Sequence, residues 1–294
     1  MYPEPRVTVI VLAYGNFGAL EKTLRSVAEQ TCAIDEIIVS DDASGEKFPA
    51  VLRESFPGVR FQVNEKNVGT VAHMNTVAKE VQSEYIKFLS GGDAFSDPQA
   101  LEALVEFAKE EKAPVVTSQA VVCTEKLARQ LYPFPGRRAK RLKSSSTEQF
   151  RVLSISNLIS APGTLFHRSF FMRLGGFDES YRLLEDWPAW LRLTREGYAI
   201  PLLDRVTCLY AAGGISSKEL DAYHAPRLRE DMLLCYKKEI LPYLNAFSSK
   251  EVRRVRYGYD LAQGVPHEEL IKRYGWLERK TTWKRSVKRW LLRL

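Results

Sequence analysis

Two adjacent carboxylates follow a short apolar run early in the chain. Asp41 and Asp42 come after Ile37-Ile38-Val39-Ser40 and before Ala43-Ser44-Gly45. A short apolar run that stops on polar and small residues is typical of a buried parallel strand opening into a turn. Ligands of open α/β sheets bind beyond the carboxyl ends of the strands. The two aspartates are therefore candidates for ligand binding. The alternative is a purely structural turn, since Asp, Ser and Gly all favour turns.

Polar residues follow two further apolar runs in the same way. Asn67-Val68-Gly69 comes shortly after residues 59–63, and Ser90-Gly91-Gly92-Asp93 comes directly after residues 85–89. Later in the chain, Glu185-Asp186-Trp187 precedes apolar residues at helical spacing, so Asp186 is expected at or near a helix N-terminus. A carboxylate there either caps free backbone donors or serves as a base in a cleft.

The segments that position these residues alternate between strands and helices. Strands are expected at 7–13, 59–63, 85–89 and 115–122, with one more ending at Asp41-Asp42, and amphipathic helices lie between them. This order predicts an α/β fold with a mainly parallel sheet flanked by helices. Neither G-x-G-x-x-G nor a Walker phosphate loop occurs.

The second half of the chain is less regular. Residues 132–148 are rich in Pro, Gly, Ser and basic residues, which predicts a long, mobile, basic loop that is either a solvated connection or a functional lid. Short strands are expected at 162–167 and 206–210, and residues 219–275 are expected to be helical.

Composition excludes several classes of protein. The chain has 294 residues, 45% hydrophobic and 27% charged, which is ordinary for a globular protein with a sizeable core. Its four cysteines form no C-x-x-C pair and its four histidines are scattered, so neither a zinc site nor a disulfide framework is expected. The sequence shows no signal peptide and no run of about 18 apolar residues. The expected location is the cytoplasm.

The net charge of +7 is concentrated at the C-terminus. Residues 279–294 contain seven Lys or Arg and no Asp or Glu, and the rest of the chain is formally neutral. This neutrality argues against a nucleic-acid partner. Trp283, Val287, Trp290 and Leu294 fall on one helical stripe, with basic residues on the other faces. Residues 276–294 are therefore expected to lie on an anionic membrane surface, making the protein peripheral on the inner face of the cell membrane. Packing of the stripe on the globular body or on a second subunit is the alternative.

The order and spacing of these motifs resemble the family 2 glycosyltransferases with the GT-A fold. The resemblance covers roughly residues 7–215 and rests on motifs that are individually weak: Val9-Ile10-Val11-Leu12-Ala13-Tyr14-Gly15-Asn16, Gln30-Thr31, Ser40-Asp41-Asp42-Ala43-Ser44, Asn67-Val68-Gly69 with Asn75, Ser90-Gly91-Gly92-Asp93, Gly175-Gly176-Phe177-Asp178-Glu179 and Leu184-Glu185-Asp186-Trp187. It implies a GT-A-like domain over 1–215, with a nucleotide-sugar half at 1–122 and an acceptor half at 150–215. A helical region at 216–275 and the basic tail at 276–294 follow.

The resemblance also implies roles for single residues. The opening turn would hold the nucleotide, through Ala13, Tyr14 and Asn16, and Asp41 would accept a hydrogen bond from a pyrimidine base. Asp93 stands where the family binds a divalent cation, Mg or Mn, and Gly92 lies beside it. Asp186 would be the catalytic base. The less favoured candidate for the base is Glu185, and Asp42 is expected only to stabilise its turn. Asn67 and Asn75 either line the donor pocket or cap the following helix.

Two departures from the family pattern bear on the cation. Only Asp93 remains where several aspartates are common, and Ala211-Ala212 replaces a basic or histidine residue of some relatives. A cation bound to a diphosphate keeps several waters and needs only one or two protein carboxylates, so one aspartate is sufficient in principle.

The function that the resemblance implies is an inverting sugar transfer from a nucleotide-diphosphate donor, UDP-linked by default, to a glycan or lipid-linked acceptor. The first rival is a non-catalytic nucleotide-sugar-binding scaffold, which the single aspartate supports and the intact Glu185-Asp186-Trp187 opposes. A nucleotidyltransferase would need an early basic glycine-rich loop, and no Lys or Arg follows Tyr14 until Lys22.

Overall fold

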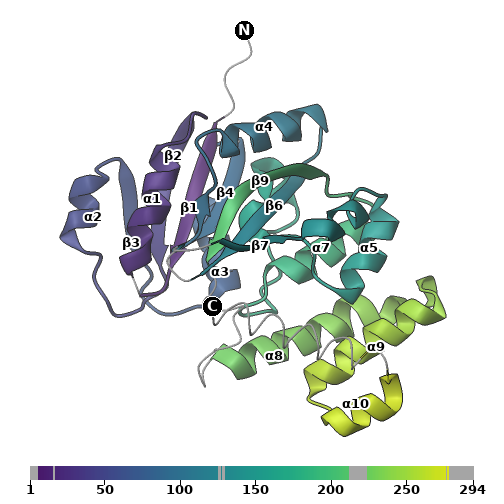
Figure 1. Ribbon diagram of the computed structural model, residues 1–294. Coiled ribbons are helices and arrows are strands. Elements are labelled where there is room, and N and C mark those ends of the chain that lie inside the picture. The colour runs from purple at the N-terminus through teal and green to yellow at the C-terminus, as the bar shows by residue number, and fades with distance from the viewer. Residues whose placement is uncertain are drawn as a thin grey trace.

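One large mixed sheet organises the molecule. The structure is a computed structural model that describes residues 6–15, 17–124, 127, 130–211, 224–275 and 277. In this part of the chain nine strands form a sheet in the order β3-β2-β1-β4-β8-β6-β9-β5, and β7 pairs with β6 (Figure 1). The strands are β1 Val7–Ala13, β2 Ile34–Asp41, β3 Val59–Val63, β4 Tyr85–Ser90, β5 Ala94–Phe95, β6 Val115–Cys123, β7 Gln130–Phe134, β8 Leu165–His167 and β9 Leu202–Ala211.

The first four strands of this order are parallel neighbours, as expected for the N-terminal half. The short strand β8 then runs antiparallel between β4 and β6, and β9 pairs with β6 in parallel.

The described helices are α1 Leu20–Ala28, α2 Ala50–Ser55, α3 Thr70–Glu80, α4 Ala100–Glu110, α5 Ser146–Ile155, α6 Arg168–Arg173, α7 Asp186–Arg195, α8 His224–Cys235, α9 Ser249–Gln263 and α10 His267–Tyr274. The mostly parallel sheet flanked by helices confirms the predicted fold class.

The sheet is buried on both faces, which explains the uninterrupted apolar sequence of its central strands. In β1, Val9 and Val11 pack in a cluster with α1 and α4, whereas Ile10 packs in a second cluster with α3 and α7. Successive side chains of a strand point to opposite faces, so a strand covered by helices on both sides needs apolar residues at every position.

The expectation of a long mobile loop over residues 132–148 is wrong. Residues 130–134 form β7, which pairs antiparallel with β6, and Gly136–Arg141 forms a short 3₁₀ helix. Ala139 and Leu142 are buried in the core that contains α5 and α7. The pairing with β6 and these two apolar side chains hold the segment on the core, and the surrounding Pro, Gly and basic residues concealed this in the sequence pattern.

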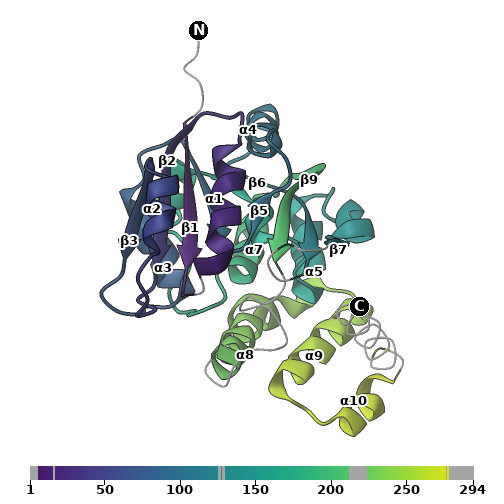
Figure 2. The same ribbon diagram turned by 60° about the vertical axis from the view of Figure 1, so that its left-hand side comes forward.

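The C-terminal helices lie together at one end of the sheet. From residue 224 the chain forms α8, continues through a π-helical turn at Tyr236–Ile240 and a 3₁₀ turn at Leu241–Ala246, and then forms α9 and α10. Figures 1 and 2 place α8 to α10 beyond the carboxyl ends of the first parallel strands. No described helix is both long enough and apolar enough to cross a membrane. The predicted domain boundary at 215/216 and most of the basic tail at 276–294 lie outside the described residues.

Candidate active site

The ends of β1, β2 and β4 meet at one edge of the sheet. Ala13 is the register partner of Asp41, and Leu12 is the partner of Ser90. Beyond the strands, the Asp42 amide donates to the Ala13 carbonyl at 3.1 Å and the Gly91 amide donates to the Leu12 carbonyl at 2.7 Å. The three turns that carry the predicted donor-binding residues are therefore side by side, as the parallel topology requires.

Asp41 links two of these turns. Its buried carboxylate accepts from the Gly15 amide at 3.1 Å through Oδ1, and from the Ser44 amide at 2.9 Å through Oδ2. Between these turns, Ala13 is buried and Tyr14 is 52% exposed. Asn16 lies outside the described residues. The structure thus places Ala13, Tyr14 and Asp41 together at the strand edge.

Asp42 is a turn-stabilising residue, the role expected for it. Its carboxylate accepts from the Asn64 side chain at 2.8 Å and from the backbone amides of Val68 and Gly69 at 3.0 and 2.9 Å. Asn67 does not cap α3, because its side chain donates to the Asp42 carbonyl at 3.2 Å. The carboxylate of Asp42 thus holds the loop between β3 and α3 against the end of β2.

Asn75 lies in the middle of α3, so the capping role considered for it is wrong. Its buried side-chain amide donates to the Phe177 carbonyl at 2.8 Å and to Glu179 at 3.0 Å, and it accepts from the Phe177 amide. Gly176 is required beside it, since a Cβ at Gly176 would lie 2.4 Å from Asn75 Oδ1. Both amide hydrogens of Asn75 are used inside the protein, so it joins α3 to the Gly-Gly-Phe segment and has no hydrogen left to donate to a ligand.

Asp93 is a buried carboxylate with one unpaired oxygen. Its Oδ1 accepts from the Ala211 amide at 3.0 Å, whereas its Oδ2 has no hydrogen-bond partner among the residues that the structure describes. Burial raises the pKa of Asp93 to about 7. Gly92, which precedes it, has φ +119° and donates its amide to Thr23 Oγ1 at 2.9 Å.

Lys87 is a second buried charge in this region. It lies on β4 with 0% exposure, and its Nζ donates to the carbonyls of Pro162, Phe88 and Thr164. Burial lowers the pKa of Lys87 to about 8, while the charge of Asp93 raises it. The ammonium group therefore binds the turn before β8 and lies within electrostatic range of Asp93.

Asp186 is the first residue of α7, where the sequence places it. Its Oδ2 accepts from the Asn157 side chain at 2.7 Å and its Oδ1 accepts from the Trp187 amide at 2.5 Å. Burial raises the pKa of Asp186, and these hydrogen bonds oppose the increase. For Glu185, burial followed by the charge of Asp186 raises the pKa to about 8. Of the two neighbours, Asp186 therefore carries the negative charge first, because only its ionised form gains hydrogen bonds from other side chains.

Arg182 connects the segment before Asp186 to the loop between β3 and α3. Its guanidinium donates to Asn67 Oδ1 at 2.9 Å, and its carbonyl accepts from the Val71 amide at 3.2 Å. A Cβ at Gly69, whose φ is +87°, would lie 2.6 Å from the Arg182 side chain. Asn67, Gly69 and Arg182 therefore pack closely, and this constellation joins the loop between β3 and α3 to the segment that leads into α7.

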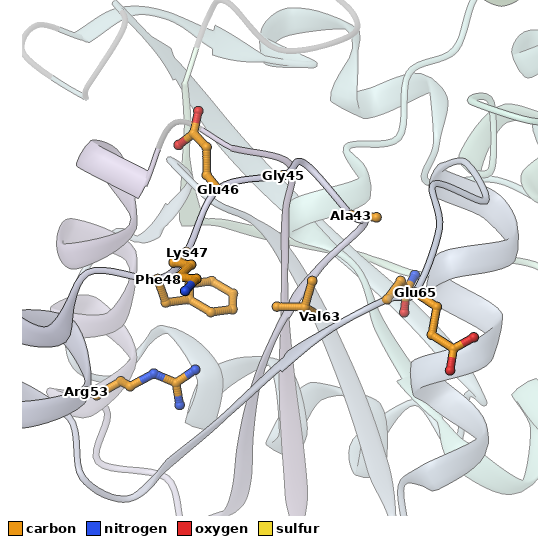
Figure 3. Close-up of a pocket in the computed structure, with 9 residues that line it drawn as sticks. Ala43, Gly45, Glu46, Lys47, Phe48, Arg53, Val63 and Glu65 are labelled. Atoms are coloured by element: carbon orange, nitrogen blue, oxygen red, sulfur yellow. The ribbon is translucent and has the colours of Figure 1, made fainter.

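A pocket of about 570 Å³ lies beside this constellation, between the connection after β2 and the end of β3. Figure 3 shows the side chains of Phe48, Arg53 and Val63 pointing toward this recess, whereas Glu46 points away. The Arg53 guanidinium lies 5.7 Å from the centroid of the Phe48 ring. The residues that line the pocket include none of the predicted site residues, so the pocket and the predicted site are separate.

Comparison with protein families decides the class of the protein. The model of the family described as "Glycosyl transferase family 2" matches residues 8–175, which is more than half of the chain. The chain belongs to glycosyl transferase family 2. This membership confirms the resemblance inferred from the motifs.

The family 2 glycosyltransferase has relatives in several bacteria. It is 27% identical over 224 residues to YwdF of Bacillus subtilis, an uncharacterized glycosyltransferase, and the match covers 74% of this chain and 79% of that protein. It is 31% identical over 116 residues to TarP of Staphylococcus aureus, a poly(ribitol-phosphate) beta-N-acetylglucosaminyltransferase, with 38% of this chain and 35% of TarP covered.

Solved structures show the same fold for this glycosyltransferase. A complex of S. aureus TarS 1–349 with UDP matches with a TM-score of 0.54 at 15% identity, covering 90% of this chain and 82% of that one. The mannosyltransferase PcManGT of Pyrobaculum calidifontis, in complex with GDP-Man and Mn²⁺, matches with a TM-score of 0.60 at 18% identity, covering 90% and 77%. These similarities confirm the GT-A fold.

Sequence reasoning missed three residues that contact the candidate site or its supporting segments. Lys87, Asn157 and Arg182 contact, respectively, the turn before β8, the Asp186 carboxylate and the Asn67 side chain. Lys87 gave one usable signal, since a lysine within an otherwise buried strand is unusual unless it is paired. Asn157 and Arg182 gave none, because their partners are distant in the sequence.

Proposed function

We propose that this family 2 glycosyltransferase moves a sugar from a nucleotide-diphosphate donor to a hydroxyl of a glycan or lipid-linked acceptor, with inversion and with Asp186 as the base. The observation that carries the proposal is the Asp186 carboxylate, which is held by Asn157 and follows a segment whose Arg182 contacts the loop between β3 and α3. The nucleotide-sugars UDP-GlcNAc and GDP-Man occupy similar folds in TarS and PcManGT, and their presence supports such a donor here.

The donor site that we propose is the strand edge. Asp41 would accept from the base, and Ala13, Tyr14 and Asn16 would line the nucleotide. Asn67 is on the adjacent loop, and Gly92, without a side chain, leaves space beside the diphosphate. Asn75 is not part of the proposed donor site, because both of its amide hydrogens bind other groups of the protein. UDP remains the default nucleotide, as the family resemblance implies, and TarS binds UDP and UDP-GlcNAc.

We further propose that Asp93 holds a divalent cation together with the donor diphosphate. The unpaired Asp93 Oδ2 fits this role, since a buried carboxylate oxygen without a partner is costly to maintain. The described residues contain no cluster of three or more His, Cys, Asp or Glu that could hold a metal alone. The diphosphate and water would therefore supply the remaining ligands, as Mg²⁺ commonly allows. When bound, the cation would neutralise charge on the leaving diphosphate.

The transfer step uses the base directly. The acceptor hydroxyl oxygen attacks the anomeric carbon as the bond from that carbon to the diphosphate oxygen breaks, and the bonding electrons leave with the nucleoside diphosphate. The hydroxyl proton moves to the carboxylate of Asp186. A single displacement with one base inverts the anomeric centre, so the configuration of the product distinguishes this mechanism from a double displacement.

Replacing Asn157 by Ala is expected to shift the pH dependence of the reaction. Asn157 stabilises ionised Asp186, so its loss raises the pKa of the base. The acidic limb of kcat/KM should move about one to two pH units upward, the equivalent of one hydrogen bond to a charged group. Activity at neutral pH falls and recovers at higher pH. Asn64→Ala is the control, because Asn64 also donates to a carboxylate but that carboxylate is Asp42 and not the base. The acidic limb of this variant should stay where it is in the wild type. A loss of equal size at every pH would contradict the role of Asn157.

The experiment that tests the proposed function measures thermal stabilisation by UDP-, GDP- and dTDP-sugars, each with manganese, magnesium or a chelator. A ligand that binds only the folded protein raises its unfolding temperature by mass action. Stabilisation by one nucleotide class supports the donor site and identifies the donor. If no nucleotide-sugar stabilises the protein, the donor site is refuted. Stabilisation by a nucleotide-sugar without any transfer to an acceptor would instead favour a non-catalytic scaffold.

We also propose that residues 276–294, most of which lie outside the described residues, attach the protein to an anionic membrane surface. Each basic residue near an anionic bilayer contributes about 1 kcal/mol, so the seven at the tail outweigh the weak binding of the formally neutral remainder. Deleting residues 276–294 is expected to abolish co-sedimentation with anionic liposomes, and neutral liposomes serve as the control. Undiminished binding of the truncated protein to anionic liposomes would refute the proposal.

A further inference from the structure

Asp231 on α8 binds the segment that leads into the candidate base. Its Oδ2 accepts from three consecutive backbone amides, those of Arg182, Leu183 and Leu184, at 3.0, 2.6 and 3.1 Å. The carboxylate is 6% exposed. Asp231 belongs to the C-terminal helices and lies beyond residues 8–175, the part of the chain that matches the family model.

The Asp231 carboxylate fixes the backbone path of residues 182–184, because it binds three consecutive amides. Residues 182–184 belong to no helix or strand, so Asp231 replaces the hydrogen bonds that regular structure would supply. Glu185 and Asp186 follow at once. Because α7 begins at Asp186, the position of its first residue depends on the direction in which residues 182–184 enter the helix.

The opposite side of the same segment contacts the donor edge. The Arg182 carbonyl accepts from the Val71 amide, and its guanidinium donates to Asn67 Oδ1. Residues 182–184 are thus held from two sides, by α8 and by the loop before α3. Asp42 independently holds that loop through the Val68 and Gly69 amides. The loop keeps this anchor when Asp231 is changed, whereas residues 182–184 lose their contacts with α8 and keep only those of Arg182.

We propose that Asp231 is a positioning residue for sugar transfer: it sets the place of Asp186 relative to the donor edge, so the C-terminal helices are part of the active site. This inference rests on the proposed function, in which Asp186 is the base. It assigns Asp231 no contact with substrate. The expected defect is therefore in the rate of the chemical step, with donor binding retained.

The kinetic test compares Asp231→Asn and Asp231→Ala with a matched control. Misplacement of a catalytic group by about 1 Å can cost on the order of 100-fold in rate, so we expect kcat to fall about 10- to 100-fold, more for Ala than for Asn. Stabilisation by the nucleotide-sugar should stay within about twofold in apparent affinity. The control is Asp260→Asn. Asp260 is a 9% exposed carboxylate on α9 whose partners, Arg273 and Tyr274, belong to the C-terminal helices. An equal loss of kcat in Asp260→Asn would mean that general destabilisation explains the effect and would overturn the proposal.

A double-variant comparison separates this inference from the proposed function. If Asp231 acts through Asp186, Asp231→Asn has less than about a twofold effect in the Asp186→Asn background, since residues that act as a unit are non-additive. An undiminished effect in that background overturns the positioning role. If Asp186→Asn alone keeps the wild-type rate, the assignment of the base in the proposed function has failed.

Hydrogen exchange provides a measurement that needs no activity. In Asp231→Asn, the backbone amides of residues 182–184 are expected to exchange at least about tenfold faster, which corresponds to about 1.4 kcal/mol of lost protection. The amides of β1 and β4 should keep their rates. Unchanged exchange at residues 182–184 would overturn the inference whatever the kinetics show.

Discussion

Replacing Asp186 by Asn is expected to lower the rate of sugar transfer by about 10²- to 10⁴-fold, the usual contribution of a general base. Asn has the same shape but cannot accept the proton of the acceptor hydroxyl. The variant should remain folded, since its side-chain oxygen can still accept from Asn157 and the repulsion between two adjacent acids is removed. Steady-state transfer and thermal unfolding measure the two effects. A folded Asp186→Asn protein that keeps most of the rate would contradict the assignment, as would a product with the donor's anomeric configuration.

Glu185→Gln is the matched comparison. Burial and the neighbouring Asp186 charge raise the pKa of Glu185 to about 8, so this side chain is mainly protonated at neutral pH. Glutamine resembles the protonated form, and the variant should retain most of the wild-type rate at pH 7. At a pH above about 8, wild-type Glu185 ionises and Gln no longer mimics it. A loss at pH 7 as large as that of Asp186→Asn would reverse the roles of the two residues.

The second large effect concerns the cation. Asp93→Asn keeps an acceptor for the Ala211 amide but removes the carboxylate charge. We expect the cation-dependent part of stabilisation by nucleotide-sugar to disappear completely. At a ligand concentration about 100 times Kd, stabilisation in the wild type amounts to about 2.7 kcal/mol. The measurement is the shift in unfolding temperature with manganese and with chelator.

Asp97→Asn is the control for this result. Asp97 is only four residues away but is half-exposed and pairs with Arg205 at 2.7 Å. It should keep the full difference between manganese and chelator. If Asp93→Asn keeps that difference too, Asp93 is not a cation ligand. If the nucleotide-sugar stabilises the wild type equally with manganese and with chelator, cationic side chains hold the diphosphate instead.

The local sequence pattern was sufficient to predict the N-terminal half of the fold. The strands at residues 7–13 and 59–63 begin and end where they were expected, and the helix of Asp186 begins at the expected residue. Continuous aliphatic runs, helical periodicity and turn residues are properties of neighbouring residues, so they are readable without tertiary structure. The prediction of a mobile loop at 132–148 was wrong because the structure of this segment depends on distant residues. Its β7 part pairs with β6, and Ala139 and Leu142 pack on the core, which the local composition does not reveal.

The same distinction between local sequence and tertiary contacts applies to the candidate site residues. The sequence alone determined which carboxylates stand at strand and helix ends, namely Asp41, Asp93 and Asp186, because an apolar run followed by an acidic residue is a local signal. Only the tertiary structure decided what surrounds them. Asp42 and Asn75 are used by the protein itself, Asp93 Oδ2 is left unpaired, and Asn157 meets Asp186 across 29 residues. Hydrogen-bond partners and burial are set by contacts between distant segments, and these depend on how the helices pack on the sheet.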